Sequence, residues 1–181
     1  MILCCDAKEG IGFENKLPWK IPEEMKLFRD KTIGNKNNCV IMGRATFESI
    51  PEKHRPLKDR YHYVLSKQGD IKYGDHPNVQ VIQSFDILLE TIASTTFDEY
   101  WIIGGKSIYE AFLVDTMIQH VDEIHISILN NRYNCDTFLP VMTHIKELNA
   151  KNPILPPFQT MQKTTYTDFT HYIICQNRDY L

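Results

Sequence analysis

The sequence predicts an α/β fold with a mainly parallel sheet, helices on both of its faces and an antiparallel edge near the C-terminus. Short apolar runs typical of buried strands alternate with segments of helical spacing through most of the chain. The last part, Thr160 to Gln176, predicts instead an antiparallel hairpin that turns near Asp168. With 181 residues, the chain has the length of one domain, which we expect to span residues 1–181.

The first half of the chain should open on a strand and a loop. Residues 2–6 form an apolar run that suits a buried strand, whereas residues 7–22 hold two glycines and two prolines, too many breakers for a regular element. A helix should begin near Pro22 and run to about Thr32, because proline fits a first turn and acidic residues there are favoured by the helix dipole. The next predicted elements are a strand at Cys39–Met42, a short helix at Gly43–Ser49, and strands at Tyr61–Leu65 and Val79–Gln83.

The second half continues the alternation. Apolar residues at helical spacing predict a helix from Phe85 to Ser94. A strand at Tyr100–Ile103 leads through two glycines into a helix from Lys106 to about Leu113. Alternating isoleucines at 124, 126 and 128 predict another strand. The stretch from Leu148 to Phe158 holds three prolines and is predicted to be a loop.

Composition excludes several classes of protein. There are 20 Lys and Arg against 23 Asp and Glu, and this near balance argues against a nucleic-acid binder. No apolar run approaches the roughly 20 residues of a membrane span, and we expect no secretory signal. The five cysteines include no Cys-x-x-Cys pair, and the seven histidines show no metal-ligand spacing. We therefore expect no metal, small buried thiols in a reducing compartment, and a cytoplasmic protein.

Two glycine-led junctions follow predicted strands, at the sheet edge where ligands of parallel sheets bind. One is Gly43-Arg44-Ala45-Thr46 and the other is Gly104-Gly105-Lys106-Ser107. Each fits an anion-binding turn and equally a plain tight turn; neither is a P-loop. Ser66-Lys67, after a third strand, could add to a phosphate site.

Glu24 is the most informative carboxylate. It lies four residues before Phe28 and so shares a helix face with an apolar side chain. A carboxylate on an apolar face needs a partner or a task. The alternative is a surface glutamate in the first turn that only satisfies the dipole. Trp19 before it suggests either a binding cleft or a lid on the core.

Arg60 enters a predicted strand and has two interpretations. It is either a solvated residue at a strand edge or a guanidinium that captures a carboxylate beside Ile50 and Leu57. His125 alternates with Ile124 and Ile126, so it should face the other side of its strand.

Taken in order, short motifs along almost the whole chain resemble dihydrofolate reductase, with a pattern closer to the eukaryotic branch. They are Gly10-Ile11-Gly12, Leu17-Pro18-Trp19 with Glu24 and Phe28, Val40-Ile41-Met42-Gly43-Arg44, the stretch from Ser49 to Arg60, Trp101-Ile102-Ile103-Gly104-Gly105 with Tyr109, and Asp136-Thr137-Phe138-Leu139-Pro140. The resemblance implies NADPH-dependent reduction of 7,8-dihydrofolate to 5,6,7,8-tetrahydrofolate, with hydride transfer to pterin C6 and protonation of N5. It also implies a place in one-carbon metabolism and thymidylate synthesis.

The resemblance also assigns residues. The implied catalytic set is Glu24, which binds the pterin, Trp19, which holds a water, and Ser127, which braces Glu24. The implied substrate-binding residues are Ile2, Leu3, Glu24, Met25, Phe28, Ile50, Leu57, Arg60 and Ile103. The implied residues around NADPH are Cys4, Ile11, Gly12, Asn15, Lys16, Leu17, Gly43, Arg44, Ala45, Thr46, Leu65, Ser66, Lys67, Ile103, Gly104, Gly105, Lys106, Ser107, Ile108 and Tyr109.

Three positions depart from the family pattern. Cys4 replaces a common alanine, Ala45 replaces a second basic residue of many eukaryotic members, and Phe47 stands where tryptophan is usual. The loss of a basic group at position 45 predicts weaker phosphate binding. We expect a monomer that binds dihydrofolate and antifolate inhibitors, without a fused thymidylate synthase.

Two other functions compete. A reductase of the same fold acts on a pyrimidine intermediate of riboflavin synthesis, but it should lack Trp19, Glu24 and Arg60. The second is a protein that binds nucleotides or sequesters antifolates without turnover, and intact Glu24, Trp19 and Gly104-Gly105 argue against it. An assay of NADPH oxidation with and without dihydrofolate separates all three.

Overall fold

The computed structural model describes residues 1–69, 71–72, 74–114, 116–151 and 157–176, and these form two compact units. One unit comprises residues 25–105, and the other joins residues 1–24 to the chain from residue 106 onward. In the described residues, parallel pairing outnumbers antiparallel pairing, and the antiparallel edge lies at the C-terminal hairpin. The predicted α/β class is therefore confirmed.

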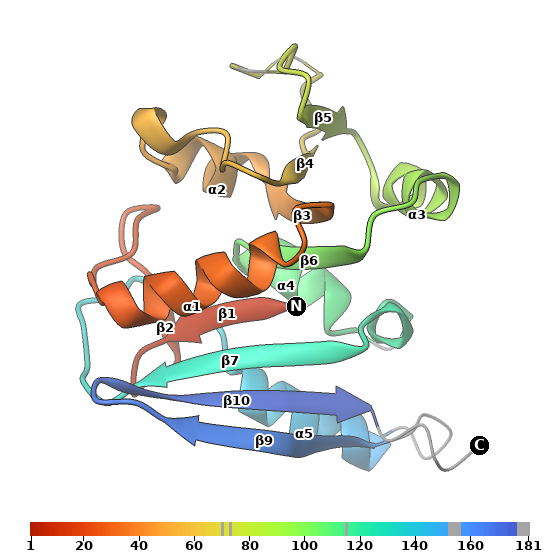
Figure 1. Ribbon diagram of the computed structural model, residues 1–181. Helices are drawn as coiled ribbons and strands as arrows, with labels where there is room; N and C mark the ends of the chain where they lie inside the picture. Colours follow the sequence, from red (N-terminus) through yellow and green to blue (C-terminus); the bar gives the residue numbers. More distant parts are fainter. Residues whose placement is uncertain (70, 73, 115, 152–156, 177–181) are drawn as a thin grey trace. The chain divides into compact units, whose positions relative to one another are not determined.

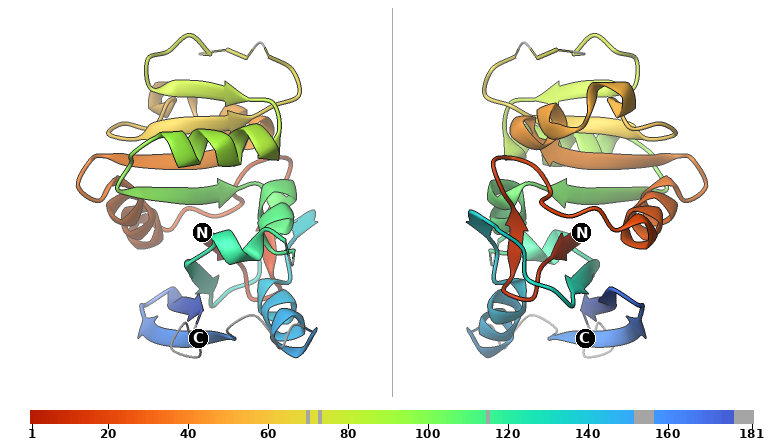
Figure 2. Two further views of the ribbon diagram at one scale, coloured as in Figure 1. Left: turned by 90° about the vertical axis from the view of Figure 1, so that its right-hand side faces the viewer. Right: turned by 90° about the vertical axis from the view of Figure 1, so that its left-hand side faces the viewer.

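The unit of residues 25–105 is built on a parallel sheet in the order β5-β4-β3-β6. Its strands are β3 (Asn38–Gly43), β4 (Tyr61–Leu65), β5 (Val79–Ile82) and β6 (Glu99–Gly104). Almost every residue of β3 is buried, as expected for a central parallel strand covered on both faces. Figure 2 shows the helices α2 (Arg44–Ser49) and α3 (Phe85–Ser94) on opposite faces of this sheet, as predicted.

The other unit contains a mixed sheet in the order β1-β7-β10-β9 (Figure 1). Its strands are β1 (Ile2–Cys5), β7 (Glu123–Leu129), β9 (Phe158–Thr165) and β10 (Phe169–Gln176). The β1–β7 pair is parallel, while β10 pairs antiparallel with both β7 and β9. The hairpin turn at residues 166–168 agrees with the predicted turn near Asp168.

The other helices of the described residues are three α-helices and two short 3-10 helices. Helix α1 (Pro22–Ile33) begins at the predicted proline, and α4 (Lys106–Phe112) follows the glycine pair. Two short 3-10 helices lie at Glu52–His54 and Ile118–His120. Helix α5 (Val141–Lys151) precedes β9 and is joined to it by hydrogen bonds between the Asn149 side chain and the Phe158 backbone.

Two predictions of the connecting segments were wrong. The predicted loop begins at Leu148, but Leu148–Lys151 is the last turn of α5; residues 152–156 of that predicted loop lie outside the described residues. The buried Val141 and Ile145, four residues apart, are the helical stripe that the proline-rich continuation obscured.

The glycines and prolines of residues 7–22 had suggested that this segment has no regular element, and this prediction was wrong. Gly10–Gly12 forms β2, which pairs antiparallel with β8 (Thr137–Phe138). A Cβ at Gly10 would lie 2.5 Å from the Cys135 sulfur, so this strand can approach its neighbour only with glycine there.

All five cysteines are free. Cys5 and Cys39 are buried, as predicted from their apolar surroundings, whereas Cys4, Cys135 and Cys175 are only half-buried. The described residues contain no cluster of three His, Cys, Asp or Glu side chains placed to hold a metal ion. None of the helices in the described ranges is long and apolar enough to cross a bilayer.

Candidate active site

Glu24 is a buried carboxylate in the first turn of α1. Its side chain is only 6% exposed, so the surface alternative for this residue is wrong. The Ser127 hydroxyl of β7 and the Cys4 thiol of β1 lie within hydrogen-bonding reach of the carboxylate. Burial raises the pKa of Glu24, and these two partners only partly oppose it. This carboxyl group is therefore protonated more readily than a glutamate in water.

Pairing of β1 with β7 supplies the surroundings of Glu24. Cys4 lies opposite Ser127 in the parallel register, which brings both side chains to the same face of the sheet. The Tyr109 hydroxyl donates to the carbonyl of Ile2 at 2.9 Å, so α4 is tied to β1. Burial raises the pKa of both the Cys4 thiol and the Tyr109 hydroxyl, so both stay neutral beside the carboxylate.

Trp19 carries an unused donor. The residue is 7% exposed and packs edge-on against Tyr133, with ring centroids 5.4 Å apart. Its indole Nε1 is buried and has no hydrogen-bond partner among the residues that the structure describes. A buried indole N–H normally donates, so this nitrogen fits a water or a ligand atom.

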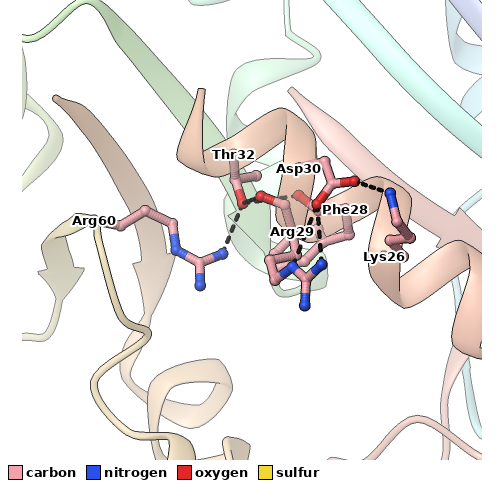
Figure 3. A network of polar contacts seen from close by, with 6 residues as sticks. All are labelled: Lys26, Phe28, Arg29, Asp30, Thr32 and Arg60. Carbon is pink, nitrogen blue, oxygen red and sulfur yellow. Dashed lines mark hydrogen bonds and ion pairs between the residues drawn. The ribbon is translucent and has the colours of Figure 1, made fainter. Parts of the chain in front are cut away.

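Arg60 is buried as well, which rules out the solvated strand-edge interpretation. The residue is 7% exposed; its Nη1 donates to Thr32 Oγ1 at 2.8 Å and its Nε donates to the Lys58 carbonyl at 3.0 Å. Figure 3 shows the guanidinium reaching from the strand side toward Thr32 on α1, beside Phe28 and Arg29. Burial lowers the pKa of Arg60 to about 10, so the group remains cationic at neutral pH.

The orientation of Arg60 leaves its outer edge available. In the described part of the chain, Nη2 has no hydrogen-bond partner, while the other two nitrogens are fixed. A guanidinium held in this way can donate two parallel hydrogen bonds to a carboxylate.

The two glycine-led junctions come together within the unit of residues 25–105. Met42, at the end of β3, pairs with Gly104 at the end of β6, and a Cβ on Gly105 would lie 2.9 Å from Thr46 Oγ1. Gly104 has a φ of 104°, a conformation that favours glycine, and the peptide that joins it to Gly105 is cis. The result is a turn of bare backbone facing a threonine hydroxyl.

Arg44 follows Gly43 at the start of α2 and adds a cation to this junction. Its guanidinium donates to the Gln68 side chain and lies 3.7 Å from a Glu48 oxygen. The nearby Ser66 is buried, whereas Lys67 is exposed. Bare glycine backbone, a hydroxyl and a guanidinium are groups that fit a phosphate-bearing cofactor such as NADPH.

The other predicted site residues differ in burial. On the substrate side, the structure buries Ile2, Leu3 and Ser127, half-buries Phe28, Ile50, Leu57 and Ile103, and leaves Met25 52% exposed. On the cofactor side, Gly12, Ser66, Gly104, Ile108 and Tyr109 are buried, while Cys4, Ile11, Gly43, Arg44, Thr46, Leu65 and Gly105 are half-buried. The exposed members are Asn15, Lys16, Leu17, Ala45, Lys67, Lys106 and Ser107.

Sequence reasoning missed Asp6, which is 1% exposed and accepts hydrogen bonds from three backbone amides, those of Lys8, Gly10 and Tyr133. It also missed His171, whose ring lies 3.1 Å from Ser127 Oγ. An aspartate four residues before Gly10 was a usable signal for a carboxylate that accepts from the amides of a turn. The position of His171 depends on strand register, which local sequence does not give.

The described residues thus form an α/β protein that holds a buried carboxylate in one unit and, in the other, a glycine junction whose groups fit a phosphate. A family model described as dihydrofolate reductase matches residues 1–166. The chain belongs to the dihydrofolate reductase family.

Individual relatives agree with this membership. The chain is similar to the dihydrofolate reductase of Heliothis virescens, with 35% identity over 75% of each chain. It is also similar to the bifunctional dihydrofolate reductase-thymidylate synthase of Daucus carota, with 32% identity over 98% of this chain and 34% of the relative. A bifunctional relative from Arabidopsis thaliana is 31% identical over 96% of this chain and 31% of its own length. The chain thus spans about a third of the length of these bifunctional relatives.

Proposed function

We propose that this chain reduces 7,8-dihydrofolate to 5,6,7,8-tetrahydrofolate with NADPH, and so serves one-carbon metabolism and thymidylate synthesis. The observation that carries the proposal is Glu24, a carboxylate kept 6% exposed with only Ser127 and Cys4 in reach. Burying a carboxylate without a cation is costly, and groups held at such a cost cluster at functional sites. Family membership supplies the task that these groups fit best.

Glu24 would bind the pterin ring through two hydrogen bonds. A pterin presents a ring N–H beside an exocyclic NH₂, and one carboxylate can accept both, which fixes the face of the ring. Ser127 would hold the carboxylate in place from β7. The unused Trp19 N–H would hold a water, which we propose as the immediate proton donor to N5.

Arg60 would bind the carboxylate of the glutamate tail of the same substrate. Thr32 and the Lys58 carbonyl fix two of its nitrogens, which leaves Nη2 and the remaining Nη1 proton to make a bidentate pair. Because the guanidinium is already oriented, little side-chain entropy is lost on binding.

The cofactor would be held by Arg44, Thr46, Ser66, Lys67 and the Gly104-Gly105 turn. Bound NADPH supplies the hydride of the reaction. The chain's own contribution is to orient the reacting groups, and cationic side chains near a 2′-phosphate favour NADPH over NADH. Free thiols suit the reducing cytoplasm, where we place a monomeric enzyme sensitive to antifolate inhibitors.

The test of the proposed function is a spectrophotometric assay of NADPH oxidation by the purified chain. We expect oxidation that depends on added dihydrofolate and is blocked by an antifolate. Oxidation driven only by a riboflavin-pathway pyrimidine would assign the rival reductase. Tight binding of NADPH and antifolate without any turnover would assign the sequestering protein.

Replacing Arg60 with leucine should raise KM for dihydrofolate far more than it lowers kcat. The contact is proposed to be similar in ground and transition states, so its loss removes uniform binding. Losing a charge-assisted pair costs roughly 1.5–3 kcal/mol, or about 10- to 150-fold in affinity. Steady-state kinetics measure the split. Thr32→Val, which keeps the guanidinium but removes its 2.8 Å brace, is the control for structural disturbance. If an inhibitor without a glutamate tail loses affinity as much as the substrate does, Arg60 is only structural.

Replacing Arg44 with alanine should narrow the preference for NADPH by weakening NADPH binding and leaving NADH binding unchanged. The guanidinium is half-buried and lies beside Glu48 and Gln68, so it is pre-oriented for a phosphate. The expected loss is about 10- to 150-fold in NADPH affinity. Binding titrations with both cofactors provide the comparison, and an equal effect on both would show that Arg44 does not contact the 2′-phosphate.

A further inference from the structure

A chain of polar side chains runs from Glu24 to an exposed carboxylate on the same sheet. Ser127 Oγ is 3.1 Å from His171 Nδ1, and His171 Nε2 is 3.2 Å from His125 Nδ1. His125 Nε2 is in turn 2.9 Å from Glu123 Oε2. With the contact between Ser127 and Glu24, the chain is continuous. Every bond in it joins groups that can both lose and gain a proton.

Strand register explains how these residues meet. Glu123, His125 and Ser127 alternate along one face of β7, and His171 of β10 lies directly opposite Ser127. His125 and His171 are therefore diagonal neighbours on that face, a spacing that ring side chains can span. Their ring centroids are 5.4 Å apart.

The middle residues of this chain of polar side chains are buried, and its outer end at Glu123 is exposed to solvent. His125 and Ser127 are 1% exposed and His171 is 4% exposed, whereas the Glu123 side chain is 53% exposed. If His125 and His171 only filled space in the core, apolar aromatic side chains would serve as well. Instead, each nitrogen of both rings has a polar neighbour in the chain.

The bonds can be arranged in two ways with the same number of protons. In the first, protonated Glu24 donates to Ser127, Ser127 donates to His171 Nδ1, His171 donates from Nε2 to His125 Nδ1, and His125 donates from Nε2 to Glu123. In the second, every proton between Glu24 and His125 has moved one step along the chain. The O–H bond of Glu24 breaks as Ser127 gains that proton, Ser127 gives its own proton to His171, and His171 gives its Nε2 proton to His125. The result is an ionised Glu24 and a His125 imidazolium beside the Glu123 carboxylate, with no electron transferred.

We infer that Ser127, His171 and His125 form a proton relay that connects Glu24 to solvent at Glu123 through β7 and β10. The inference rests on the proposed function for its purpose, because reduction of dihydrofolate consumes one proton. When a substrate ring is bound to Glu24, the relay still lets this carboxylate exchange its proton with solvent. Ser127 and the two histidines are then positioning and relay residues that touch no substrate.

Other ionisable groups around the relay set the field in which it works. On the Glu24 side, Cys4 and Tyr109 are neutral, because burial raises the pKa of each. At the outer end, the N-terminal ammonium of Met1 donates to the Glu123 carbonyl at 2.7 Å. Among the described residues at this end, Cys175 hydrogen-bonds Glu123, and Asp122 lies close enough to raise the pKa of the same thiol.

Histidine tautomers report the relay without any turnover. The probe is the full chain with ¹⁵N-labelled histidine and ¹³C-labelled glutamate, followed by NMR as pH is raised. We expect the protonated nitrogen of His171 to change from Nε2 to Nδ1 at the same midpoint as the Glu24 carboxyl signal. Glu24→Gln should abolish this change. If His171 keeps one tautomer while Glu24 titrates, there is no relay.

Kinetics of two variants separate relaying from bracing. His171→Phe removes both ring nitrogens, whereas His171→Asn keeps a polar group beside Ser127 but ends the path. Both should lower kcat for dihydrofolate at pH 8 by about tenfold and should converge with the parent in acid; the loss is smaller than the 10²–10⁴ of a removed general acid because water can still deliver protons.

The matched control is His144→Phe, because His144 bonds only the Pro140 carbonyl among the described residues and should change nothing. If His171→Asn restores the parent rate at pH 8, His171 only braces Ser127 and the relay is wrong. A parent that shows the tautomer change but reduces no dihydrofolate would overturn the proposed function and leave the relay standing.

Discussion

Glu24→Gln is expected to abolish nearly all dihydrofolate-dependent NADPH oxidation at neutral pH. The amide replaces one of the two acceptors that a pterin needs with a donor, and it removes the negative charge that favours a protonated N5. A general acid–base or charge-stabilising group of this kind is worth roughly 10²–10⁴-fold in rate. Activity should partly recover in acid, where solvent protonates more of the substrate directly.

The same substitution should leave the protein as stable as the parent or more stable. Burial raises the pKa of Glu24 above that of the unfolded chain. The stability that comes from its protonated form is complete below the unfolded pKa and is lost as pH rises through the folded pKa. At neutral pH the buried charge therefore opposes folding. Glutamine removes that cost, provided that Ser127 still pairs with the amide.

Thermal melting beside a pH–rate profile measures both effects. The matched control is Glu23→Gln, since Glu23 is the exposed neighbour in the same turn and carries the same charge. It should change neither melting nor rate appreciably. A Glu24→Gln protein that melts well below the parent, or that keeps most of its activity at pH 7, contradicts the role assigned to this carboxylate.

Asp6→Ala is expected to destabilise the protein more than any other single change considered for it. One Asp6 oxygen accepts from the amides of Lys8 and Gly10 at 2.8 and 2.9 Å, and the other accepts from Tyr133 at 2.8 Å. Hydrogen bonds to a charged group contribute about 1.5–3 kcal/mol each, so losing all three should cost roughly 3–5 kcal/mol after partial rehydration of the amides. Activity should also fall, because Tyr133 packs against Trp19.

The pH dependence of Asp6 has the opposite sign to that of Glu24. Burial alone would raise the pKa of Asp6, but the three amides outweigh it and hold the pKa below its usual value. The resulting stability is present above the unfolded pKa and is lost as pH falls through the folded pKa. The parent and Asp6→Ala should therefore differ less in their free energy of unfolding in strong acid than at neutral pH.

Urea unfolding at neutral and acidic pH measures this difference. Asp6→Asn should be intermediate, since its oxygen can still accept, and the exposed Asp86→Ala should cost no more than about 1 kcal/mol. A neutral-pH loss for Asp6→Ala as small as that of Asp86→Ala would show that the three amides find other partners.

The site was predictable from sequence where the signal was local. The Pro22 start, the acidic first turn and the apolar residue four positions on all pointed to Glu24, and the glycine pair after an apolar strand pointed to the junction at Gly104. What local sequence could not decide was burial. Arg60 reads like any charged residue at a strand edge until Thr32, 28 residues away, is seen to hold it.

Contacts that depend on pairing between distant strands could not be predicted from local sequence. His125 was correctly expected to face away from Ile124 and Ile126, but nothing local showed that this face is buried rather than wet. His171 meets Ser127 across 44 residues through the β7–β10 register. A shift of that register by one residue would turn His171 to the other face, so only the assembled sheet reveals the relay.

The most direct test of the reductase proposal uses NADPH labelled with deuterium at the transferable position of the nicotinamide. The purified chain is supplied with dihydrofolate, and the product is examined by NMR and mass spectrometry. We predict tetrahydrofolate with deuterium at C6, formed in equal amount to the NADPH oxidised. Oxidation of NADPH without deuterium at C6, or no tetrahydrofolate at all, would contradict the account.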